Sequence, residues 1–446
     1  MKVLVIGSGG REHAICWGIK KNKRIKELYC APGNGGISDI AHIVDIKSDN
    51  LQELLNFALA KDIDLTIVGP EQPLSLGIVD LFKKNELLIF GPDKNSSQLE
   101  SSKEYSKNFM KRNNIPTANF ETFTEFEKAH KYIKKSKFPI VLKADGLAAG
   151  KGVRVCYDYK EADEFLTFLM KDKIFAKSGE KVVIESFLEG EEASFFVFTD
   201  GHTILPLDSS QDHKRLLDQD RGPNTGGMGA YSPAPVIDDE TRANIMNEVV
   251  IPVFNGFKKD KINYTGILYI GLMIKDKKPS VVEFNCRFGD PEAQPLLYRM
   301  NSDIFDLFYK TSTKQLSNYV LEWKNCYSVT VVLASLGYPD KTSNGLISNL
   351  SNFKEKGVYI FHAGTTLKDD NFIVSGGRVL GVTSESQTLK GAIDLAYEAI
   401  SKIDTSSLAY RKDIGLKGLN RNLKSSWHST KLWQIKEINM RFKCQL

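Results

Sequence analysis

The sequence lacks an apolar run that is long enough to cross a membrane. No stretch of about 18 consecutive apolar residues occurs in the 446-residue chain, whereas a membrane-spanning helix needs about 20. The first apolar run, residues 2–6, ends at Gly7, which is too early for the apolar segment of a secretory signal peptide. We therefore expect a cytoplasmic protein that has no membrane partner.

Cysteine is scarce, and its spacing is uninformative. The six cysteines are spread from Cys16 to Cys444 without a C-x-x-C pair. Zinc sites and dithiol redox sites usually contain such pairs. We therefore expect these thiols to be small buried side chains in a reducing compartment, and neither disulfides nor a zinc site.

The body of the chain has no excess of either charge, although the whole sequence has a net charge of +5. Six of the 60 Lys and Arg residues, but only one of the 55 Asp and Glu residues, lie after Asn420. A balanced body argues against a nucleic-acid-binding surface. The basic tail, residues 421–446, also contains Trp427, Trp433 and Phe442. It is either a solvated extension or a weakly docking segment.

Two common nucleotide-binding motifs are absent or incomplete. There is no G-x-x-x-x-G-K-[ST] loop. The segment 7–13, GSGGREH, follows a strand pattern, but Glu12 stands where a dinucleotide fingerprint needs its third glycine. The second strand, 28–30, also ends without the acid that would bind a ribose. The loop is therefore either a plain turn or an anion site at a helix N-terminus, and an NAD site is not expected.

Strands and helices alternate over about the first 100 residues. The strand patterns are at 2–6, 28–30, 65–68 and 88–90, and the helical patterns include 51–61 and 75–84. This order is typical of a doubly wound α/β domain. Ligands bind at the carboxyl ends of the strands in such sheets. Pro70-Glu71, which follows the third strand, is therefore a candidate site or a simple turn.

Residues 138–155, FPIVLKADGLAAGKGVRV, are the strongest candidate for a nucleotide site. A strand pattern that carries Lys143 ends at Asp145, and a second strand pattern begins at Val153. The loop between them contains Gly146, Gly150, Lys151 and Gly152. Glycines allow a close approach of the backbone to a polyphosphate, and lysines supply positive charge. Taken alone, the stretch is equally compatible with an ordinary hairpin.

The strict alternation ends near residue 100, and an α+β pattern follows. Two dense polar segments interrupt it: the charge-rich 208–215 and the glycine-rich 222–233. Long loops of this kind inside a compact protein are usually functional or disordered, and their aromatic and apolar neighbours favour function. A further α/β unit begins near 327 and has no chemical signature of its own.

A candidate metal site lies at the end of the strand pattern 280–285. Strand alternation puts Glu283, Asn285 and Arg287 on one face. A carboxylate beside an amide oxygen suits a hard cation such as Mg²⁺. A salt bridge at the end of a strand is the alternative.

These motifs together resemble the ATP-grasp superfamily, and more closely the glycinamide ribonucleotide synthetase family. The match is carried by GSGGREHA (7–14), APGNGG (31–36), GPEQPL (69–74), KADGLAAGKGV (143–153), ESFLEGEEAS (185–194), SSQDHKR (209–215), GPNTGGMGAYSPAP (222–235), VVEFNCRFGDPEAQ (281–294) and YRKDIG (410–415). The tail after about Asn420 falls outside it. The resemblance makes other ATP-grasp ligases, an oxidoreductase or a non-catalytic nucleotide-binding module weaker alternatives.

The resemblance implies a fold and a reaction. The fold would be multidomain, α/β and α+β: an N-terminal doubly wound pre-ATP-grasp domain (1–101), a two-part ATP-grasp domain (102–326, with a mobile lid at about 121–190) and a small C-terminal α/β domain (327–420). The enzyme would be a C–N ligase of de novo purine biosynthesis. It would use ATP to join glycine to 5-phosphoribosylamine through glycyl phosphate. A monomer or a dimer is expected.

The resemblance also assigns roles to single residues. Lys103 and Lys143 would contact the ATP phosphates, Glu185 would lie near the adenine, and Glu192, or the adjacent Glu191, would bind the ribose. The residues expected at the ATP site are Lys103, Lys143, Gly146, Gly150, Lys151, Gly152, Glu185, Phe187, Leu188 and Glu192.

Glu283 and Asn285 match the ligands of Mg²⁺ or Mn²⁺ in this family. Lys143, Arg287 and Asp290 match its catalytic residues. Other residues are expected beside the glycine and phosphoribosylamine: Asp212, His213, Lys214, Arg215, Gly226, Gly227 and Gly229. One departure concerns the strand before Glu283. Many superfamily members carry another metal-binding acid there, whereas this chain has the apolar run 269–272.

Overall fold

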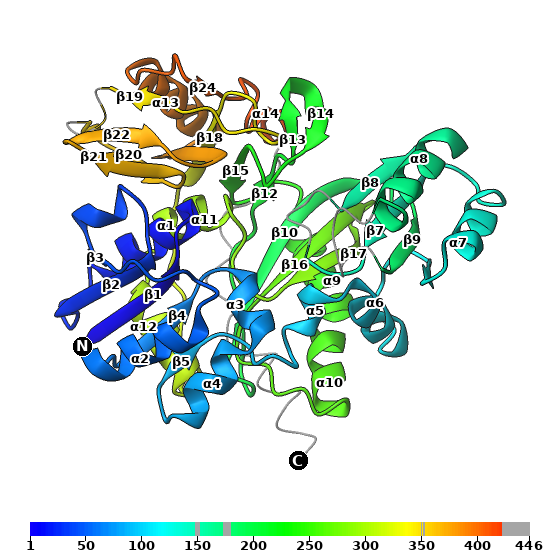
Figure 1. The fold of residues 1–446 in the computed structure, drawn as a ribbon, viewed down its shortest axis with the longest axis horizontal. Helices are drawn as coiled ribbons and strands as arrows, with labels where there is room; N and C mark the ends of the chain where they lie inside the picture. Colours follow the sequence, from blue (N-terminus) through cyan, green and yellow to red (C-terminus); the bar gives the residue numbers. More distant parts are fainter. Residues whose placement is uncertain (148–151, 173–179, 349, 351–352, 422–446) are drawn as a thin grey trace.

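The computed structural model describes residues 1–147, 152–172, 180–348, 350 and 353–421 (Figure 1). Gly150, Lys151 and the tail from residue 422 lie outside the described residues. Within the described part, no helix combines the length and the apolar character that membrane crossing requires.

The N-terminal unit is a parallel five-stranded sheet with the order β3-β2-β1-β4-β5, which confirms the doubly wound fold. Its strands are β1 (Lys2–Gly7), β2 (Glu27–Pro32), β3 (His42–Ile43), β4 (Leu65–Val68) and β5 (Ile89–Phe90). Its helices are α1 (Gly10–Ile19), η1 (Ile37–Asp39), α2 (Leu51–Lys61), α3 (Glu71–Leu76) and α4 (Ile78–Lys84). The strand order reverses between β1 and β4, where such sheets usually bind ligands.

A side chain of the protein itself fills the crevice between β1 and β4. The Glu12 carboxylate accepts a hydrogen bond from the Gly9 amide at 2.6 Å and pairs with Arg11 at 2.6 Å. A Cβ atom added at Gly69 would lie 2.0 Å from Glu12 Oε1. The anion at the start of α1 is therefore a capping glutamate, and its position explains why a dinucleotide pyrophosphate has no room there.

Two helices expected to be continuous are broken. The helical pattern 75–84 is divided at Gly77, whose φ of +96° is in the left-handed region that favours glycine. The residues from 96 to 113, whose sequence predicts one helical stretch, are divided into α5 (Gln98–Ser101) and α6 (Lys103–Arg112). The Ser102 hydroxyl accepts from the Tyr105 amide and so caps a new helix.

Two antiparallel four-stranded sheets form the middle of the chain, with the orders β11-β10-β16-β17 and β6-β9-β7-β8. The first contains β10 (Glu191–Thr199), β11 (Ile204–Pro206), β16 (Gly266–Lys275) and β17 (Lys278–Asn285). The second, which we call the lid sheet, contains β6 (Phe120–Phe123), β7 (Ile140–Ala144), β8 (Val153–Cys156) and β9 (Val182–Ser186). The helices beside them are α7 (Phe126–Ile133), α8 (Tyr159–Met170), α9 (Asp239–Ile245), the π-helical η4 (Met246–Val250) and α10 (Ile251–Lys259).

The lid sheet has an apolar core of its own. Side chains such as Ile133, Leu142 and Phe165 cluster between this sheet and helices α7 and α8, apart from the other cores. Figure 1 shows this unit projecting to one side of the molecule. Residues 187–190 join β9 of the lid sheet to β10 of the other sheet. The lid is therefore a separately packed body on a short connection.

The C-terminal sheet has the order β12-β15-β18-β23-β20, with β24 paired to β18. Its strands are β12 (Gln211–Asp212), β15 (Gly229–Ser232), β18 (Tyr327–Ser335), β20 (Val358–His362), β23 (Arg378–Ser386) and β24 (Leu408–Ala409). The remaining elements are β13 (Arg215–Leu217), η3 (Asp218–Asp220), β14 (Arg221–Asn224), α11 (Ala293–Arg299), α12 (Ile304–Ser312), β19 (Leu346–Ile347), β21 (Thr365–Lys368), β22 (Asn371–Val374), α13 (Leu389–Ser401) and α14 (Leu416–Leu419).

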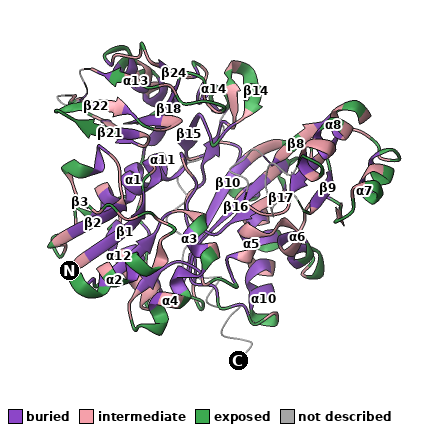
Figure 2. Cartoon of the chain, viewed as in Figure 1, coloured by how far each residue is buried: buried purple, intermediate pink, exposed green. Residues whose placement is uncertain are grey.

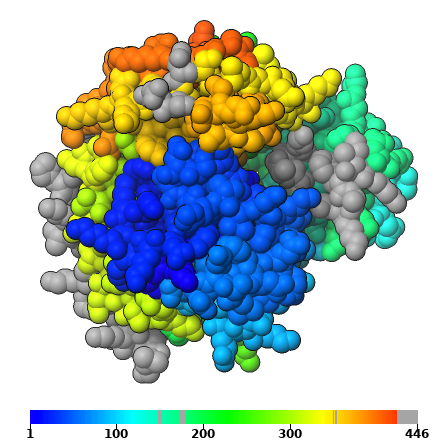
Figure 3. Space-filling model, turned by 60° about the vertical axis from the view of Figure 1, so that its left-hand side comes forward, coloured from blue at the N-terminus to red at the C-terminus, as the bar shows by residue number. Residues whose placement is uncertain are grey.

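The two polar segments expected to be loops are thus partly strands. β12 and β15 pair with the C-terminal sheet through β18, while the hairpin β13–β14 extends beside them. Figure 2 shows the central strands buried, and Figure 3 shows the N-terminal unit packed beneath the C-terminal one. This sheet connects the candidate substrate residues directly to the C-terminal unit.

Candidate functional site

A cavity of about 900 Å³ lies among all three units. Its wall combines side chains of the lid sheet, of the sheet that contains β17, and of the N- and C-terminal units. The predicted site residues that line it are Lys103, Lys143, Gly152, Glu185, Phe187, Leu188, Glu192, Asp212, Lys214, Arg215, Gly226, Glu283, Asn285, Arg287 and Asp290. Residues far apart in the sequence are therefore brought to one place.

The lid sheet presents one mixed face to the cavity. In the register of β7 and β9, Val141 is opposite Glu185, and strand alternation puts Lys143 on the same face as Val141. The Lys143 ammonium lies 3.0 Å from Glu185 Oε1 and donates to the Val282 carbonyl at 3.1 Å. This lysine thus connects the lid to β17.

Lys107 is a site residue that sequence reasoning missed. Its buried ammonium donates to Thr117 Oγ1 and the Ala118 carbonyl at 2.8 and 2.9 Å and lies 3.5 Å from Glu185 Oε2. Burial lowers the pKa of Lys107 to about 8, against the opposing effect of Glu185. The helical spacing could have indicated it, because Lys107 lies one turn after Lys103 on α6 and therefore on the same face.

Lys103 lies at the start of α6, close to the end of β7. Its ammonium donates to the Gly146 carbonyl at 2.9 Å, and burial lowers its pKa. Asp145 fixes this junction, since its carboxylate accepts from the Ser102 hydroxyl at 3.2 Å and the Glu104 amide at 3.0 Å. Gly146 itself supplies a backbone contact and does not line the cavity among the described residues.

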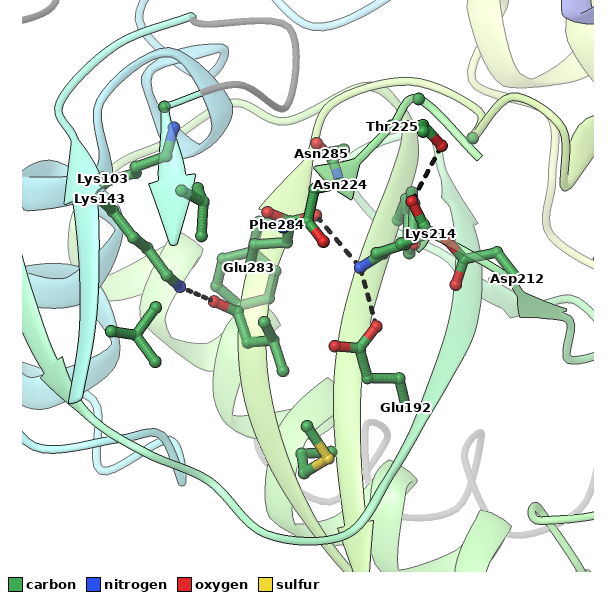
Figure 4. Close-up of a pocket in the computed structure, with 18 of the residues that line it drawn as sticks. Lys103, Lys143, Glu192, Asp212, Lys214, Asn224, Thr225, Glu283, Phe284 and Asn285 are labelled. Atoms are coloured by element: carbon green, nitrogen blue, oxygen red, sulfur yellow. Dashed lines mark hydrogen bonds and ion pairs between the residues drawn. The ribbon is translucent and has the colours of Figure 1, made fainter. Parts of the chain in front are cut away.

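Glu283 and Asn285 lie on one face of β17, as alternation predicts (Figure 4). Burial alone would raise the pKa of Glu283, but the cations of Lys214, Lys143 and Lys103 together lower it to about 2. The residue paired with Glu283 on β16 is Gly271, where an added Cβ would lie 3.2 Å from Glu283 Cγ. This explains why no second acid comes from the preceding strand.

Two carboxylates of the N-terminal part hold Arg287. The guanidinium lies 2.6 Å from Glu100 and 3.2 Å from Glu71. Burial raises the pKa of Glu100 to about 7, whereas Arg287 and Arg11 overcome burial at Glu71 and lower its pKa to about 2. Glu71, which could have been a plain turn residue, is therefore a site residue, and Glu100 had no sequence signal.

Lys214 lies between two acids on the opposite wall. Its ammonium is 3.2 Å from Glu192 and 4.0 Å from Glu283, and Figure 4 shows the three side chains converging. Glu191, the alternative ribose residue, instead pairs with Arg421. Both acids line the cavity, but Glu192 is the one that pairs with Lys214 beside Glu283.

His213, Gly227 and Gly229 are not among the described residues that line the cavity. His213 alternates with Asp212 and Lys214, so its side chain points to the other side and packs beside Tyr231. Burial lowers the pKa of this His213 to about 3. Gly229 packs against Thr330 and Ile414 in the sheet. These three residues support the site from behind.

Arg378 of the C-terminal unit organises the wall beside Asp290. Its guanidinium donates to the Gly226 carbonyl at 2.7 Å and contacts the Asp290 carbonyl and, at 3.5 Å, its carboxylate. Asp290 also accepts from Gln294 at 2.8 Å. Although burial alone would raise it, the pKa of Asp290 is lowered by Arg378, Arg11 and Gln294. No local sequence pattern indicated a site residue in this unit.

Comparisons with known proteins match most of the chain to one family of enzymes. The models of the N domain, the ATP-grasp (A) domain and the C domain of phosphoribosylglycinamide synthetase match residues 1–100, 101–293 and 328–417. A phosphoribosylamine–glycine ligase of Ralstonia nicotianae is 46% identical over 423 residues, which are 94% of this chain and 100% of the relative. One of Clostridium acetobutylicum is 46% identical, with 93% and 99% covered.

Solved structures agree as well. The crystal structure of phosphoribosylamine–glycine ligase from Thermotoga maritima has a TM-score of 0.81 and 33% identity, and the match covers 93% of this chain and 100% of that one. A biotin carboxylase from Campylobacter jejuni has a TM-score of 0.73 at 17% identity, with 93% and 94% covered. At this low identity, the similarity to the biotin carboxylase shows a shared fold and nothing about the reaction.

Proposed function

The chain belongs to the phosphoribosylglycinamide synthetase family, and from that premise we propose that the cavity between its lid sheet and β17 is the ATP site. The protein is a C–N ligase of purine biosynthesis. It joins glycine to 5-phosphoribosylamine and forms glycinamide ribonucleotide, ADP and phosphate. Enzymes with the ATP-grasp fold use ATP together with a divalent metal ion.

The observation that carries the proposed ATP site is the pair of lysines that faces Glu283 and Asn285 across the cavity. The triphosphate would lie between Lys103 and Lys143 on one side and β17 on the other. The adenine would lie beside the connection that contains Phe187 and Leu188, which both line the cavity. Glu192 would bind the ribose hydroxyls.

The residues on β17 fit a hard divalent cation. Glu283 is ionised and Asn285 adds an amide oxygen, which are ligand types that Mg²⁺ and Mn²⁺ accept. No cluster of three His, Cys, Asp or Glu side chains able to hold a metal occurs in the described part of the chain. Two protein ligands supplemented by phosphate oxygens and water are compatible with Mg²⁺. The ion would neutralise charge on the phosphates.

The reaction requires activation of a poor electrophile, the glycine carboxylate. We propose that this carboxylate attacks the γ-phosphorus of ATP, which forms glycyl phosphate and releases ADP. The amine of phosphoribosylamine then attacks the acyl carbon, loses a proton, and displaces phosphate. Phosphoryl transfer depends mainly on alignment and charge stabilisation. Lys103, Lys143 and Arg287 would supply both, so no protein nucleophile is needed.

Water must be kept from the acyl phosphate, which it would hydrolyse. The lid sheet supports this requirement because it has its own core and a connection of only four residues, 187–190. A separately packed body of this kind is suited to closing over a bound nucleotide. Gly152 and Lys103, at the two sides of the lid loop, line the cavity that it would cover.

The phosphoribosylamine would lie toward the C-terminal unit. Among the lysines and arginines that line the cavity, only Lys103 and Arg215 have no carboxylate within ion-pair distance in the described part of the chain. Cations without a carboxylate partner suit phosphate groups. We assign Lys103 to ATP and Arg215 to the ribose phosphate. The domain boundaries, the cytoplasmic location and a monomeric or dimeric state are part of the same proposal.

The experiment that tests this function measures ADP and phosphate release with freshly prepared phosphoribosylamine. We expect turnover that requires glycine, phosphoribosylamine and Mg²⁺ together. Omitting each component in turn provides the controls. Folded protein that releases no ADP under the complete conditions would show that the assignment is wrong.

A further inference from the structure

Most carboxylates at the cavity wall have a cationic partner. The ten that line it are Glu71, Glu100, Glu185, Glu191, Glu192, Asp212, Asp220, Glu283, Asp290 and Glu292. Eight of them lie within 4.0 Å of a lysine or arginine. Asp212 and Glu292 have no such partner among the described residues. They therefore stand apart from the other acids of the site.

These two side chains are also among the most buried of the set. Asp212 is 8% exposed and Glu292 is 3% exposed. A buried carboxylate without a cation is costly, because it loses its hydration without compensation. Burial, together with Glu292, Glu192 and Glu283, raises the pKa of Asp212 to about 7 against the opposing effect of Lys214. A positively charged group bound beside Asp212 and Glu292 would therefore stabilise the ionised form of these two carboxylates.

Glu292 and Asp212 both act on the hydroxyl of Tyr269. Ser194 Oγ lies 3.0 Å from Tyr269 Oη and 3.3 Å from Glu292 Oε1. Burial raises the pKa of Tyr269, and the charges of Glu292 and Asp212 both add to this shift. Figure 4 shows Asp212 directed from β12 to the side of the cavity that holds Lys214. Both acids therefore line the same cavity, within electrostatic reach of one buried hydroxyl.

The backbone is shaped to keep Glu292 in place. A Cβ atom added at Gly289 would lie 2.4 Å from Glu292 Oε2, so a larger residue at 289 would force this carboxylate to move. Glu292 and Glu283 both raise the pKa of Arg287, which places the guanidinium within electrostatic reach of Glu292. Arg287, which is held by Glu71 and Glu100, and the two acids without a cationic partner therefore line the same cavity.

This pairing matches a small molecule that has a carboxylate at one end and an ammonium group at the other. We propose that Asp212 and Glu292 bind the ammonium group of the amino acid substrate, while its carboxylate lies on the side of Arg287. The inference rests on the proposed function and adds the residues that recognise glycine. A resident metal ion is a poorer occupant, because the described residues offer no three-ligand cluster.

The inference predicts discrimination against a hydroxy acid. Glycolate has the carboxylate of glycine but no ammonium group, so it cannot compensate the two acids. Calorimetric titration of the full chain, saturated with Mg²⁺ and a non-hydrolysable ATP analogue, measures both ligands without any turnover. We expect Asp212→Asn and Glu292→Gln each to weaken glycine binding by about tenfold or more, toward the affinity of glycolate.

Three results give the test its controls. Affinity for the ATP analogue should stay within about twofold in both variants, since neither side chain is assigned to the nucleotide. Glycolate affinity should not fall in parallel with that of glycine. Glu248→Gln, which changes an exposed acid on η4, should bind all ligands like the parent protein.

Several outcomes would overturn the inference. One is glycine affinity within about twofold of the parent value in both variants. Another is a parallel loss of glycine, glycolate and nucleotide binding, because that would indicate a structural role. Glycine that does not bind the parent protein would also overturn it. If glycine binds as expected but the complete assay releases no ADP, the proposed function fails while ammonium recognition stands.

Discussion

Replacing Lys143 tests the proposed ATP site at its most constrained residue. Lys143 is 4% exposed, and its ammonium has two described partners, Glu185 at 3.0 Å and the Val282 carbonyl at 3.1 Å. Lys143→Met keeps most of the apolar stem and removes the charge. The variant therefore separates the role of the ammonium group from that of the packing.

The expected loss of stability is moderate. Removing one partner from a buried polar pair costs about 1–3 kcal/mol. Breaking a buried ion pair can cost about 3–5 kcal/mol of unfolding free energy. We expect a smaller loss here, because Lys107 remains 3.5 Å from the Glu185 carboxylate. Thermal unfolding followed by circular dichroism measures this loss and confirms that the variant is folded.

The expected loss of activity is larger. A donor aimed at charge that develops in the transition state contributes about 100–1,000-fold to kcat. Steady-state ADP release, with Lys84→Met as a control for an exposed helical lysine, measures it. A folded Lys143→Met enzyme with kcat within about threefold of the parent would refute the reasoning.

Three further predictions follow from single contacts. Glu283→Gln should raise the Mg²⁺ concentration needed for half-maximal rate by about tenfold or more, since a charged ligand becomes neutral; an unchanged Mg²⁺ titration would contradict its assignment. Arg378→Gln should raise KM for phosphoribosylamine more than KM for ATP, because Arg378 holds Gly226 and Asp290 and no lid residue; equal changes in both constants would indicate a general structural defect. KM for glycine should fall as the pH rises through about 7, because the Asp212 carboxyl, whose pKa is about 7, must lose its proton to bind an ammonium group. Its neighbours do not change their charge in this range, since the pKa of Glu283 is lowered and the pKa values of Lys214 and Tyr269 are raised. A glycine KM with the same pH dependence in Asp212→Asn would contradict that explanation.

Local sequence patterns were sufficient for most regular elements. The periodicity predicted α2 and β4 at their observed bounds, because their apolar positions repeat with the period of the element. The same patterns missed the break at Gly77, since the amphipathic repeat continues across it. They also missed β12 and β15, because these two short strands are stabilised by pairing through β18 and not by their own composition.

The site was predictable where one strand or loop carries the chemistry. Strand alternation made Glu283 and Asn285 candidates, and the glycine-rich loop made Lys143 a candidate, while the resemblance assigned their roles. Glu100, Glu292 and Arg378 were not predictable in this way. Their roles depend on long-range contacts, such as Glu100 with Arg287 and Arg378 with Gly226, which no local spacing encodes.

The central claim is that ATP activates the glycine carboxylate in this cavity. The most direct measurement uses glycine labelled with oxygen-18 in its carboxylate, followed by mass spectrometry of the released phosphate. An acyl phosphate transfers one carboxylate oxygen to phosphate, so the account predicts one labelled oxygen in each phosphate released. Glycinamide ribonucleotide formed together with unlabelled phosphate would contradict it.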